Sequence, residues 1–543
     1  MTSNEFKTKA TALIDELKGV CANYGLGNDG NEFKIITQVF LYKFINDKFA
    51  YEVKRIEPAL SKAKSWEDAL RAKPAKAYEL LLMQLGADTA RLKSEHFLST
   101  LWGKQNENNF AATVDATLLD IAKLNAEIFS VKTNDGQKIV LFDAVTQYVS
   151  SQRDAFAKAI INKLIPFSFE HIFGEKFDFF ATLFEYLIKD YNKDGGGKYA
   201  EYYTPHAVAK IMAACLVPKA VKNVTCYDPA AGSGTLLMNL AHAIGEDRCT
   251  IYTQDISQKS SSLLRLNLIL NNLVHSIPNV IQGNTILEPY HKEDKGTGLR
   301  KFDYIVSNPP FKLDFSDFRD QLDSKANQKR FFAGIPNVPN KEKDKMAIYL
   351  LFIQHVIDSL GPKGRAAIVV PTGFITAQSG IEKSIRQHLV EKKMLGGVVS
   401  MPSNIFATTG TNVSILFIDS TNTGDVILID ASNLGEMVKE GKNKKTLLRP
   451  AEERQIIDAF NAKVAVADFS VVVPYDEFEE KNYSLSAGQY FDLKTEYETI
   501  SSADFNARMA DATGRLEALF QQSKAFEKEI RNQLKAVKYD AAS

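Results

Sequence analysis

The chain has 543 residues, of which 45% are hydrophobic and 24% charged, a composition typical of a globular protein with two or three domains. Lys plus Arg and Asp plus Glu both number 66, so the net charge of +0 argues against a protein that grips nucleic acid through an overall basic surface. Four well-separated cysteines argue against a zinc or disulfide framework and for a reducing compartment. We find no signal peptide and no run of about 18 apolar residues, and expect a cytoplasmic protein without membrane association.

Residues 1–160 are predicted to form a helical N-terminal domain. Apolar residues recur at helical spacing in 6–17, 33–49, 75–85, 116–129 and 142–164. This region contains no glycine-rich or catalytic pattern. We interpret it as a helical bundle that docks on DNA or on a partner.

A further helix is predicted over residues 167–190, followed by a glycine-rich loop that contains Gly195, Gly196 and Gly197. The motif Tyr203-Thr204-Pro205 then opens a helix over 207–216, with Thr204 as the expected N-cap and Pro205 at the first helical position. An exposed helix N-terminus of this kind can bind a carboxylate, although by itself it indicates only a capped helix.

The next segment resembles a cofactor-binding strand, loop and helix. A short strand over 224–227 is followed by Asp228-Pro229-Ala230-Ala231-Gly232-Ser233-Gly234-Thr235 and by a helix over 236–244. Glycine and alanine let the backbone approach a ligand closely, and the helix offers its dipole. Asp228 stands where its carboxylate could pair with an ammonium group of the ligand.

Two more strands are predicted to end in polar residues. The strand over 249–254 ends at Asp255, where a carboxylate usually accepts hydrogen bonds from ribose hydroxyls. After a helix over 263–273, a third strand ends at Asn284, which could contact the base of a cofactor. Each residue alone could be a solvated turn residue. Together with Asp228 they indicate a ligand site, because ligands bind at the carboxyl ends of parallel strands.

The fourth strand, over 302–307, ends at Asn308-Pro309-Pro310-Phe311. The prolines stop the strand and hold Asn308 extended. The Asn308 amide oxygen, the Pro309 main-chain oxygen and the Phe311 ring then face one small space. Two acceptors and a ring suit the amine of a planar base, which must be flipped out of a duplex to enter. The plainer alternative is a proline-stopped strand with a core phenylalanine.

Residues 311–345 form a long polar segment that we expect to become ordered on target DNA; a charged, disordered surface loop is the alternative. A mostly parallel sheet with helices on both faces is completed by helices over 346–360 and 381–395 and by strands over 365–371, 397–401 and 413–419.

A basic cluster before a helix over 451–460 could contact phosphates or could be a solvated run of charged residues. A long helix over 503–537 carries a broken apolar stripe typical of helix pairing. The basic cluster consists of Lys439, Lys442, Lys444, Lys445 and Arg449.

The motifs Tyr203-Thr204-Pro205, Asp228 to Gly234 and Asn308-Pro309-Pro310-Phe311, in this order, resemble those of the N6-adenine DNA methyltransferases. The resemblance is closest to the modification (methylation) subunit of type I restriction-modification systems. Segments 366–373, 401–406 and 413–418 resemble later parts of the same family, so the resemblance covers nearly the whole chain.

This resemblance implies an α/β fold, the Rossmann-like, mostly parallel sheet of S-adenosylmethionine-dependent methyltransferases. It implies a helical N-terminal domain (1–160), a catalytic domain (161–475) and a helical C-terminal tail for subunit assembly (476–543). The implied reaction is methyl transfer from S-adenosylmethionine to the N6 amine of a flipped-out adenine in double-stranded DNA. The implied partners are a DNA-specificity subunit, with two copies of this chain for each copy of it, and a restriction/translocase subunit.

The resemblance also implies roles for individual residues. Asn308 and Pro309 hold the target amine, Pro310 belongs to the same catalytic motif, and Phe311 stacks on the base. Many relatives have aspartate where this chain has Asn284, which makes Asn284 the weakest of the cofactor contacts. The full set of implied cofactor-binding residues is Tyr203, Thr204, Pro205, Asp228, Ala230, Gly232, Ser233, Gly234, Thr235, Asp255, Ile256, Asn284 and Asn308.

Three other functions are compatible with parts of this pattern. The first is a self-sufficient adenine methyltransferase, or one that acts on RNA or on a glutamine amide. The second is a non-catalytic scaffold of the same fold, which the intact motif set argues against. The third, a dinucleotide-dependent oxidoreductase, has no use for the motif that begins at Asn308.

Overall fold

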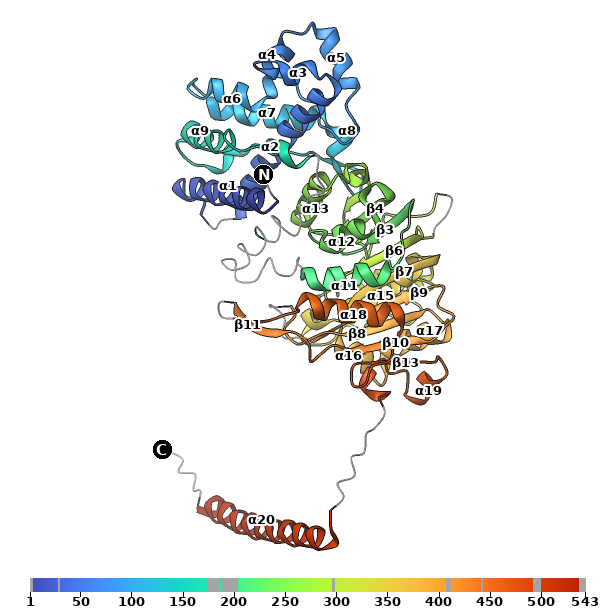
Figure 1. The fold of residues 1–543 in the computed structure, drawn as a ribbon. Coiled ribbons are helices and arrows are strands. Elements are labelled where there is room, and N and C mark those ends of the chain that lie inside the picture. The colour runs from blue at the N-terminus through green and yellow to red at the C-terminus, as the bar shows by residue number, and fades with distance from the viewer. Residues whose placement is uncertain are drawn as a thin grey trace. The chain divides into compact units, whose positions relative to one another are not determined.

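The computed structural model describes residues 3–27, 30–173, 186, 204–294, 298–406, 412–440, 443–491 and 500–536. The chain forms two compact units, Met1–Phe491 and Asp492–Ser543. Figure 1 shows the first unit as a group of helices, α1 to α9, and a large sheet covered by further helices. The helix expected over 167–190 lies largely outside the described residues, apart from a single 3₁₀ turn at Glu170–Ile172.

The N-terminal region is mainly helical, as predicted. Its longer helices are α1 (Ser3–Asn23), α2 (Gly30–Ile56), α7 (Phe110–Leu124) and α9 (Arg153–Leu164). Shorter helices connect them: α3 (Ala59–Lys62), α4 (Trp66–Arg71), α5 (Ala75–Met83), α6 (Leu98–Lys104) and α8 (Ala126–Phe129). The apolar positions of α1 are spaced by three or four residues and are all buried: Phe6, Ala10, Leu13, Ile14 and Leu17.

Helix α2 is buried on nearly every side, which its polar residues did not predict. Lys43 and Asp47, one helical turn apart, are both buried and form an ion pair at 2.9 Å. Asp47 also accepts a hydrogen bond from the main-chain N–H of Phe169 at 2.9 Å. Pairing and hydrogen bonding offset the cost of burying the two charges, so α2 can serve as the central helix of the region.

Two parts of the N-terminal region differ from the predicted helices. Residues 142–152 are not α-helical, and α9 begins only at Arg153. The buried carboxylate of Asp115 accepts hydrogen bonds from the N–H groups of Val145 and Thr146, which removes donors that a helix would need. In addition, β1 (Val131–Thr133) and β2 (Lys138–Ile139) form a hairpin that the sequence did not predict.

The sheet has eleven strands among the described residues, in the order β13-β10-β8-β9-β7-β6-β3-β4-β5-β1-β2. Its parallel part, β1-β5-β4-β3-β6-β7, includes all four strands that were predicted to carry the site. The antiparallel strand β9 lies between β7 and β8. Because most neighbouring strands are nevertheless parallel, the expectation of a mostly parallel sheet is confirmed. The strand bounds are β3 (Val224–Asp228), β4 (Cys249–Asp255), β5 (Val280–Gln282), β6 (Phe302–Ser307), β7 (Leu360–Pro371), β8 (Leu395–Ser400), β9 (Val413–Asp419), β10 (Val426–Asp430) and β13 (Ser470–Val473).

The chain order within the sheet creates a switch point between β3 and β6. From β3 the chain moves outward through β4 to β5, and then returns to place β6 on the other side of β3. Ligands bind at such points in open α/β sheets, because the connections leave the two central strands in opposite directions and open a crevice between them. Asp228 is the last residue of β3 and Asn308 follows the last residue of β6.

Alternate residues of β7 enter different cores, which shows that both faces of the sheet are covered. Ala367 and Val369 belong to the large cluster that includes residues of α11, α12 and α13. Ala366, Ile368 and Val370 belong to a second cluster with residues of α15 and α17. The helix bounds are α11 (His206–Leu216), α12 (Thr235–Ile244), α13 (Gln258–Leu270), α15 (Tyr349–Ser359), α16 (Thr372–Thr376), α17 (Gly380–Glu391) and α18 (Pro450–Ala462).

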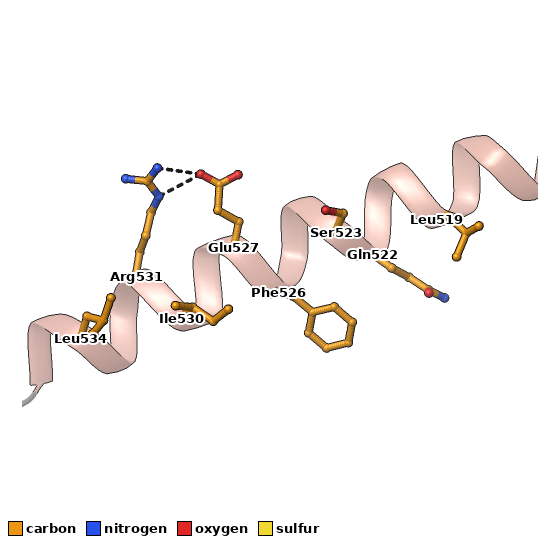
Figure 2. A pocket seen from close by; sticks show the side chains of 8 residues that line it. All are labelled: Leu519, Gln522, Ser523, Phe526, Glu527, Ile530, Arg531 and Leu534. Carbon is orange, nitrogen blue, oxygen red and sulfur yellow. Dashed lines mark hydrogen bonds and ion pairs between the residues drawn. The ribbon is translucent and has the colours of Figure 1, made fainter. Parts of the chain in front are cut away.

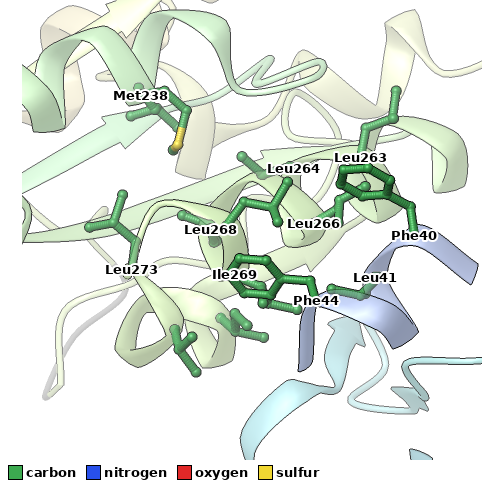
Figure 3. Close-up of a cluster of buried hydrophobic side chains, with 14 of the residues drawn as sticks. Phe40, Leu41, Phe44, Met238, Leu263, Leu264, Leu266, Leu268, Ile269 and Leu273 are labelled. Carbon is green, nitrogen blue, oxygen red and sulfur yellow. The ribbon is translucent and has the colours of Figure 1, made fainter. Parts of the chain in front are cut away.

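Helix α13 joins the N-terminal region to the sheet. It begins at Gln258, earlier than predicted, because the Ser257 hydroxyl accepts a hydrogen bond from the N–H of Ser260 as an N-cap. Phe40 and Phe44 of α2 pack beside the leucines of α13 (Figure 3). The buried Arg265 donates hydrogen bonds to the carbonyls of Ile139 (2.9 Å) and Val140 (2.8 Å), at the end of the β1–β2 hairpin.

The expectation that residues 311–345 stay unordered until DNA binds is wrong for their central part. Phe315, Leu322 and Phe331 are buried in a small core of their own. Arg330, a basic residue within this segment, is only 4% exposed. Its guanidinium donates to the carbonyls of Thr285 and Ile286, both at 2.8 Å, so this cation serves packing and cannot contact phosphates.

The C-terminal part of the first unit contains elements that were not predicted. These are β10, β13, α19 (Glu477–Glu480) and the hairpin of β11 (Glu436–Glu440) and β12 (Asn443–Leu447). The hairpin carries part of the expected basic cluster: Lys439 lies opposite Lys444 in the register, and Lys442 lies outside the described residues.

The described part of the second unit is formed mainly by α20 (Ser502–Ala536), close to the predicted bounds. All four cysteines of the chain are buried and free. Among the described residues, no helix combines the length and apolar character needed to cross a membrane.

Candidate active site at the carboxyl edge of the sheet

The loop between β3 and α12 is held against α13. Gly234 has a φ of +87°, and a Cβ at this position would lie 2.3 Å from Cδ1 of Leu264. Asn267 of α13 donates a hydrogen bond to the carbonyl of Ser233 at 2.7 Å. Only glycine meets both the backbone conformation and the close approach, so the loop presents bare backbone before Thr235, the first residue of α12.

Asp255 ties this loop to the end of β4. Its Oδ2 accepts a hydrogen bond from the N–H of Gly232 at 2.9 Å, and its Oδ1 accepts one from the N–H of Ser257 at 2.8 Å. Each carboxylate oxygen has a second lone pair, so Asp255 can still accept hydrogen bonds from the hydroxyls of a ligand. The next residue, Ile256, is 66% exposed and places an apolar surface beside the carboxylate.

Asn284 heads the turn after β5. Its Oδ1 accepts hydrogen bonds from the N–H groups of Ile286 (3.0 Å) and Leu287 (3.1 Å). The hydroxyl of the following residue, Thr285, donates to the carbonyl of Pro229 at 2.7 Å and so fixes the turn to the β3 loop. Because its oxygen is used locally, a contact of Asn284 with a base would come from Nδ2, a donor.

Asn308 is half-buried, and Thr204 sets the orientation of its amide. Nδ2 of Asn308 donates a hydrogen bond to Oγ1 of Thr204 at 3.1 Å, which leaves Oδ1 as the acceptor for a substrate. The prediction that Thr204 caps α11 is wrong: Pro205 occupies the N-cap position and makes no side-chain cap bond. The Thr204 hydroxyl serves the site instead of the helix.

The residues after Asn308 differ in their exposure. Pro309 is buried, Pro310 is exposed and Phe311 is half-buried. The ring of Phe311 meets the ring of Tyr349 edge to face, with centroids 6.2 Å apart and an interplanar angle of 74°. This contact restricts the Phe311 ring and leaves part of it at the surface, as a stacking residue requires.

Asp228 is an acid of the site with a strongly shifted pKa. It is buried, and burial raises the pKa of its carboxyl from 3.8 to about 8, against the opposing effects of the Ala230 N–H and the Ser307 hydroxyl. The nearby carboxylate of Asp255 raises this pKa further. A cationic ligand would stabilise the ionised form of this buried carboxyl. Groups with strongly shifted pKa values cluster at functional sites.

The structure thus gathers most of the predicted site residues at one edge of the sheet. Tyr203 lies outside the described residues. Sequence reasoning missed Ser307 beside Asp228, Thr285, and the α13 residues Leu264 and Asn267. Ser307 is the one that the sequence could have indicated, because it ends the strand directly before Asn308. The others contact the site across long separations in sequence.

Solved structures identify the class of fold. The chain is similar to the methyltransferase subunit of the type I restriction-modification system from Streptococcus thermophilus, with a TM-score of 0.68 and 21% sequence identity. The similarity covers 91% of this chain and 100% of that one. The fold is therefore that of the S-adenosylmethionine-dependent methyltransferases, as predicted.

Residues 175–499 match the profile of the N-6 DNA Methylase family. The methylase subunit of the type I restriction enzyme MpnII from Mycoplasma pneumoniae is 28% identical over 348 residues, which is 63% of this chain and 62% of that relative. The methylase subunit of MjaIX from Methanocaldococcus jannaschii is 26% identical over 398 residues, 70% of this chain and 66% of that relative. This chain belongs to the N-6 DNA methylase family, and the matched part spans about two thirds or less of the length of these two relatives.

The raised pKa of Asp228 predicts a pH-dependent cost in stability. The pKa of this carboxyl is about 8 in the folded protein and 3.8 in the unfolded chain. The folded state therefore favours the protonated form, and the free energy of unfolding falls as the pH rises from about 4 to about 8. Asp228→Asn, which is neutral at every pH, should raise the free energy of unfolding by up to about 4 kcal/mol at pH 7 and by little at pH 4. Urea unfolding of both proteins at several pH values measures this difference. A constant difference across that range would contradict the assignment.

Proposed function

We propose that this chain transfers a methyl group from S-adenosylmethionine to the N6 amine of a flipped-out adenine in double-stranded DNA, as the modification subunit of a type I restriction-modification complex. The observation that carries the proposal is the hydrogen bond from Asn308 to Thr204. It assigns the Asn308 amide and leaves Oδ1 to accept from an amine, beside the main-chain oxygen of Pro309.

The proposed chemistry depends on positioning. The amine of adenine is a poor nucleophile because its lone pair is delocalised into the ring. Acceptance of its two hydrogens by Asn308 and Pro309 favours the pyramidal geometry in which the lone pair can attack, and the Phe311 ring holds the base plane. No strong general base is needed, because the amine becomes acidic once it carries the methyl group.

The residues around β3, β4 and β5 suit S-adenosylmethionine, which supplies an electrophilic methyl group when bound. The buried carboxyl of Asp228, whose pKa is raised by burial, would pair with the amino group of the methionyl part, beside the bare backbone of Gly232 and Gly234. Asp255 would accept from the ribose hydroxyls. The exposed side chain of Ile256 would cover the adenine, and Nδ2 of Asn284 would donate to it.

Thr204 and Pro205 would lie near the methionyl end with Tyr203. Ala230, Ser233 and Thr235 belong to the loop that encloses this end of the cofactor.

We propose that base reading is delegated to a DNA-specificity subunit, with two copies of this chain for each copy of it, and that a restriction/translocase subunit joins the same complex. The net charge of +0 supports dependence on a partner for DNA binding. The relatives named above are themselves methylase subunits of type I restriction enzymes. A cytoplasmic location follows from this role.

Helix α20 has the features of an assembly helix. Its apolar residues follow one another at spacings of four, seven, three, seven, four and four, a broken form of the apolar seam by which helices pair in coiled coils. Figure 2 shows Leu519, Phe526, Ile530 and Leu534 along one side of the helix, with the Glu527–Arg531 ion pair away from them. The seam residues that the structure shows exposed by half or more are Phe505, Met509, Leu516, Leu519, Phe526, Ile530 and Leu534.

These assignments divide the chain into three functional regions. We propose a helical N-terminal domain over 1–160, a catalytic domain over 161–475 and a C-terminal assembly tail over 476–543. The β1–β2 hairpin belongs to the first region in sequence and to the catalytic sheet in space.

The decisive experiment is transfer of labelled methyl from S-adenosylmethionine to unmethylated DNA, by this chain alone and with a specificity subunit encoded beside it. We expect transfer only in the mixture, because this chain does not read bases. Asn308→Ala in the mixture should lower the rate about 100-fold or more and retain cofactor binding. Transfer by the chain alone would indicate a self-sufficient methyltransferase, and failure to bind the cofactor would indicate a scaffold.

Thr204→Val tests the orientation of the Asn308 amide. Valine has the shape of threonine without the hydroxyl, so Asn308 loses its partner and can rotate. We expect kcat at saturating cofactor to fall about fivefold to tenfold. Thr204→Ser, which keeps the hydroxyl, should behave like the parent chain. Equal kcat for Thr204→Val and Thr204→Ser would show that the hydroxyl does not orient the amide.

Removal of residues 500–543 should abolish assembly with the specificity subunit, because the seam on α20 is lost. Size-exclusion chromatography of the mixed subunits measures this, and cofactor binding by the truncated chain shows that the first unit remains folded. A charge on the seam, Leu519→Glu, should give the same result, and Gln522→Glu, beside the seam, is its matched control. An intact complex after truncation would contradict the assignment.

A further inference from the structure

Asn134, at the turn of the β1–β2 hairpin, connects the N-terminal region to two strands of the proposed cofactor site. Its Oδ1 accepts a hydrogen bond from Nε2 of Gln254 at 3.0 Å, and its Nδ2 donates one to the carbonyl of Glu288 at 3.1 Å. Its main-chain N–H donates to the carbonyl of Gln282 at 3.1 Å. One residue from the N-terminal region thus contacts both β4 and the chain on either side of the turn after β5.

The partners of Asn134 are neighbours of proposed cofactor contacts. Gln254 directly precedes Asp255 in β4, and Gln282 ends β5 two residues before Asn284. Gln254 also donates to the carbonyl of Glu288 at 2.8 Å. The Asn134 and Gln254 amides therefore form a bridge between the end of β4 and the turn that Asn284 heads.

Gly283 shows how closely Asn134 approaches this turn. A Cβ on Gly283 would lie 2.1 Å from Oδ1 and 2.2 Å from Cγ of Asn134. Real Cβ atoms do not come this close to another heavy atom, so any larger residue would displace the Asn134 side chain or the turn. Asn134, about 150 positions earlier in the chain, therefore explains why glycine is needed directly before Asn284.

The hairpin that carries Asn134 is held in place by other contacts. Residues of β1 pair with β5 in parallel register, and Arg265 of α13 donates to the carbonyls of Ile139 and Val140. The turn is closed by side chains that do not reach the cofactor strands: Asp135 accepts hydrogen bonds from the hydroxyl of Thr133 and from Gln137. The loss of the Asn134 side chain should therefore leave the hairpin formed.

We propose that Asn134 is a positioning residue for the adenosine end of the cofactor site. It sets the distance between Asp255 and Asn284 from outside the site, and it makes the N-terminal region part of the cofactor-binding structure. The proposal rests on the S-adenosylmethionine site proposed above. It assigns a function to a hairpin that otherwise only extends the sheet.

Titration calorimetry of the full chain with S-adenosylmethionine tests the proposal. Asn134→Ala should raise the Kd about tenfold, because Asp255 and Asn284 are no longer held at a fixed separation. Asn134→Asp, which keeps the shape, should also weaken binding, since it loses the donor to the Glu288 carbonyl and places a carboxylate beside it. In the complex with the specificity subunit, KM for the cofactor should rise and kcat at saturating cofactor should stay the same. A general loss of structure would lower kcat as well.

Asp135→Ala is the matched control, because it changes the neighbouring residue of the same turn without touching Gln254 or Glu288. It should leave the Kd unchanged. Gly283→Ala should weaken binding through the collision with Asn134, and Gly283→Ala combined with Asn134→Gly should recover part of the loss. Equal Kd values for the parent chain, Asn134→Ala and Asn134→Asp would overturn this proposal and leave the proposed function intact. Absence of binding by the parent chain would overturn the proposed function itself.

Discussion

The candidate site depends on one constraint: parallel strands end at the same edge of a sheet. In this chain β3, β4, β5 and β6 all deliver a polar residue to that edge, and the change of direction between β3 and β6 opens the crevice there. Asp228 and Asn308 come from the two strands that flank the crevice, although 79 residues lie between them in the sequence. Every other feature of the site is arranged around this pair.

Several site residues already use a polar side-chain atom for a hydrogen bond within the protein. These internal hydrogen bonds decide which atoms remain available to a ligand. Nδ2 of Asn308 donates to Thr204, which leaves Oδ1 of Asn308 as an acceptor for a ligand. Oδ1 of Asn284 accepts from Ile286 and Leu287, which leaves Nδ2 of Asn284 as a donor. Asp255 holds the glycine loop with Oδ2 and accepts from the N–H of Ser257 with Oδ1, and each oxygen still has a lone pair to offer. Side chains tied in this way lose little further entropy when a ligand binds, which favours affinity.

The N-terminal region is more than an appendage of the catalytic sheet. Its hairpin adds β1 and β2 beyond β5, its helix α2 packs on α13, and Asn134 reaches the turn that carries Asn284. Helix α13 in turn contacts the glycine loop through Leu264 and Asn267. A change in the N-terminal region can therefore reach the cofactor site through packed side chains and hydrogen bonds.

The sequence alone determined the parallel α/β fold, the strands β3, β4 and β6 and the motif residues at their ends. These features follow from local patterns: apolar runs stopped by Pro or Gly, and polar residues directly after them. It did not predict the β1–β2 hairpin, the burial of Arg330 or the partner of Thr204, whose hydroxyl was expected to cap α11. The order of the strands, the assignment of the Asn308 amide and the need for glycine at 283 were decided only by the tertiary structure. Each of these depends on contacts between residues far apart in the chain, which no local pattern encodes.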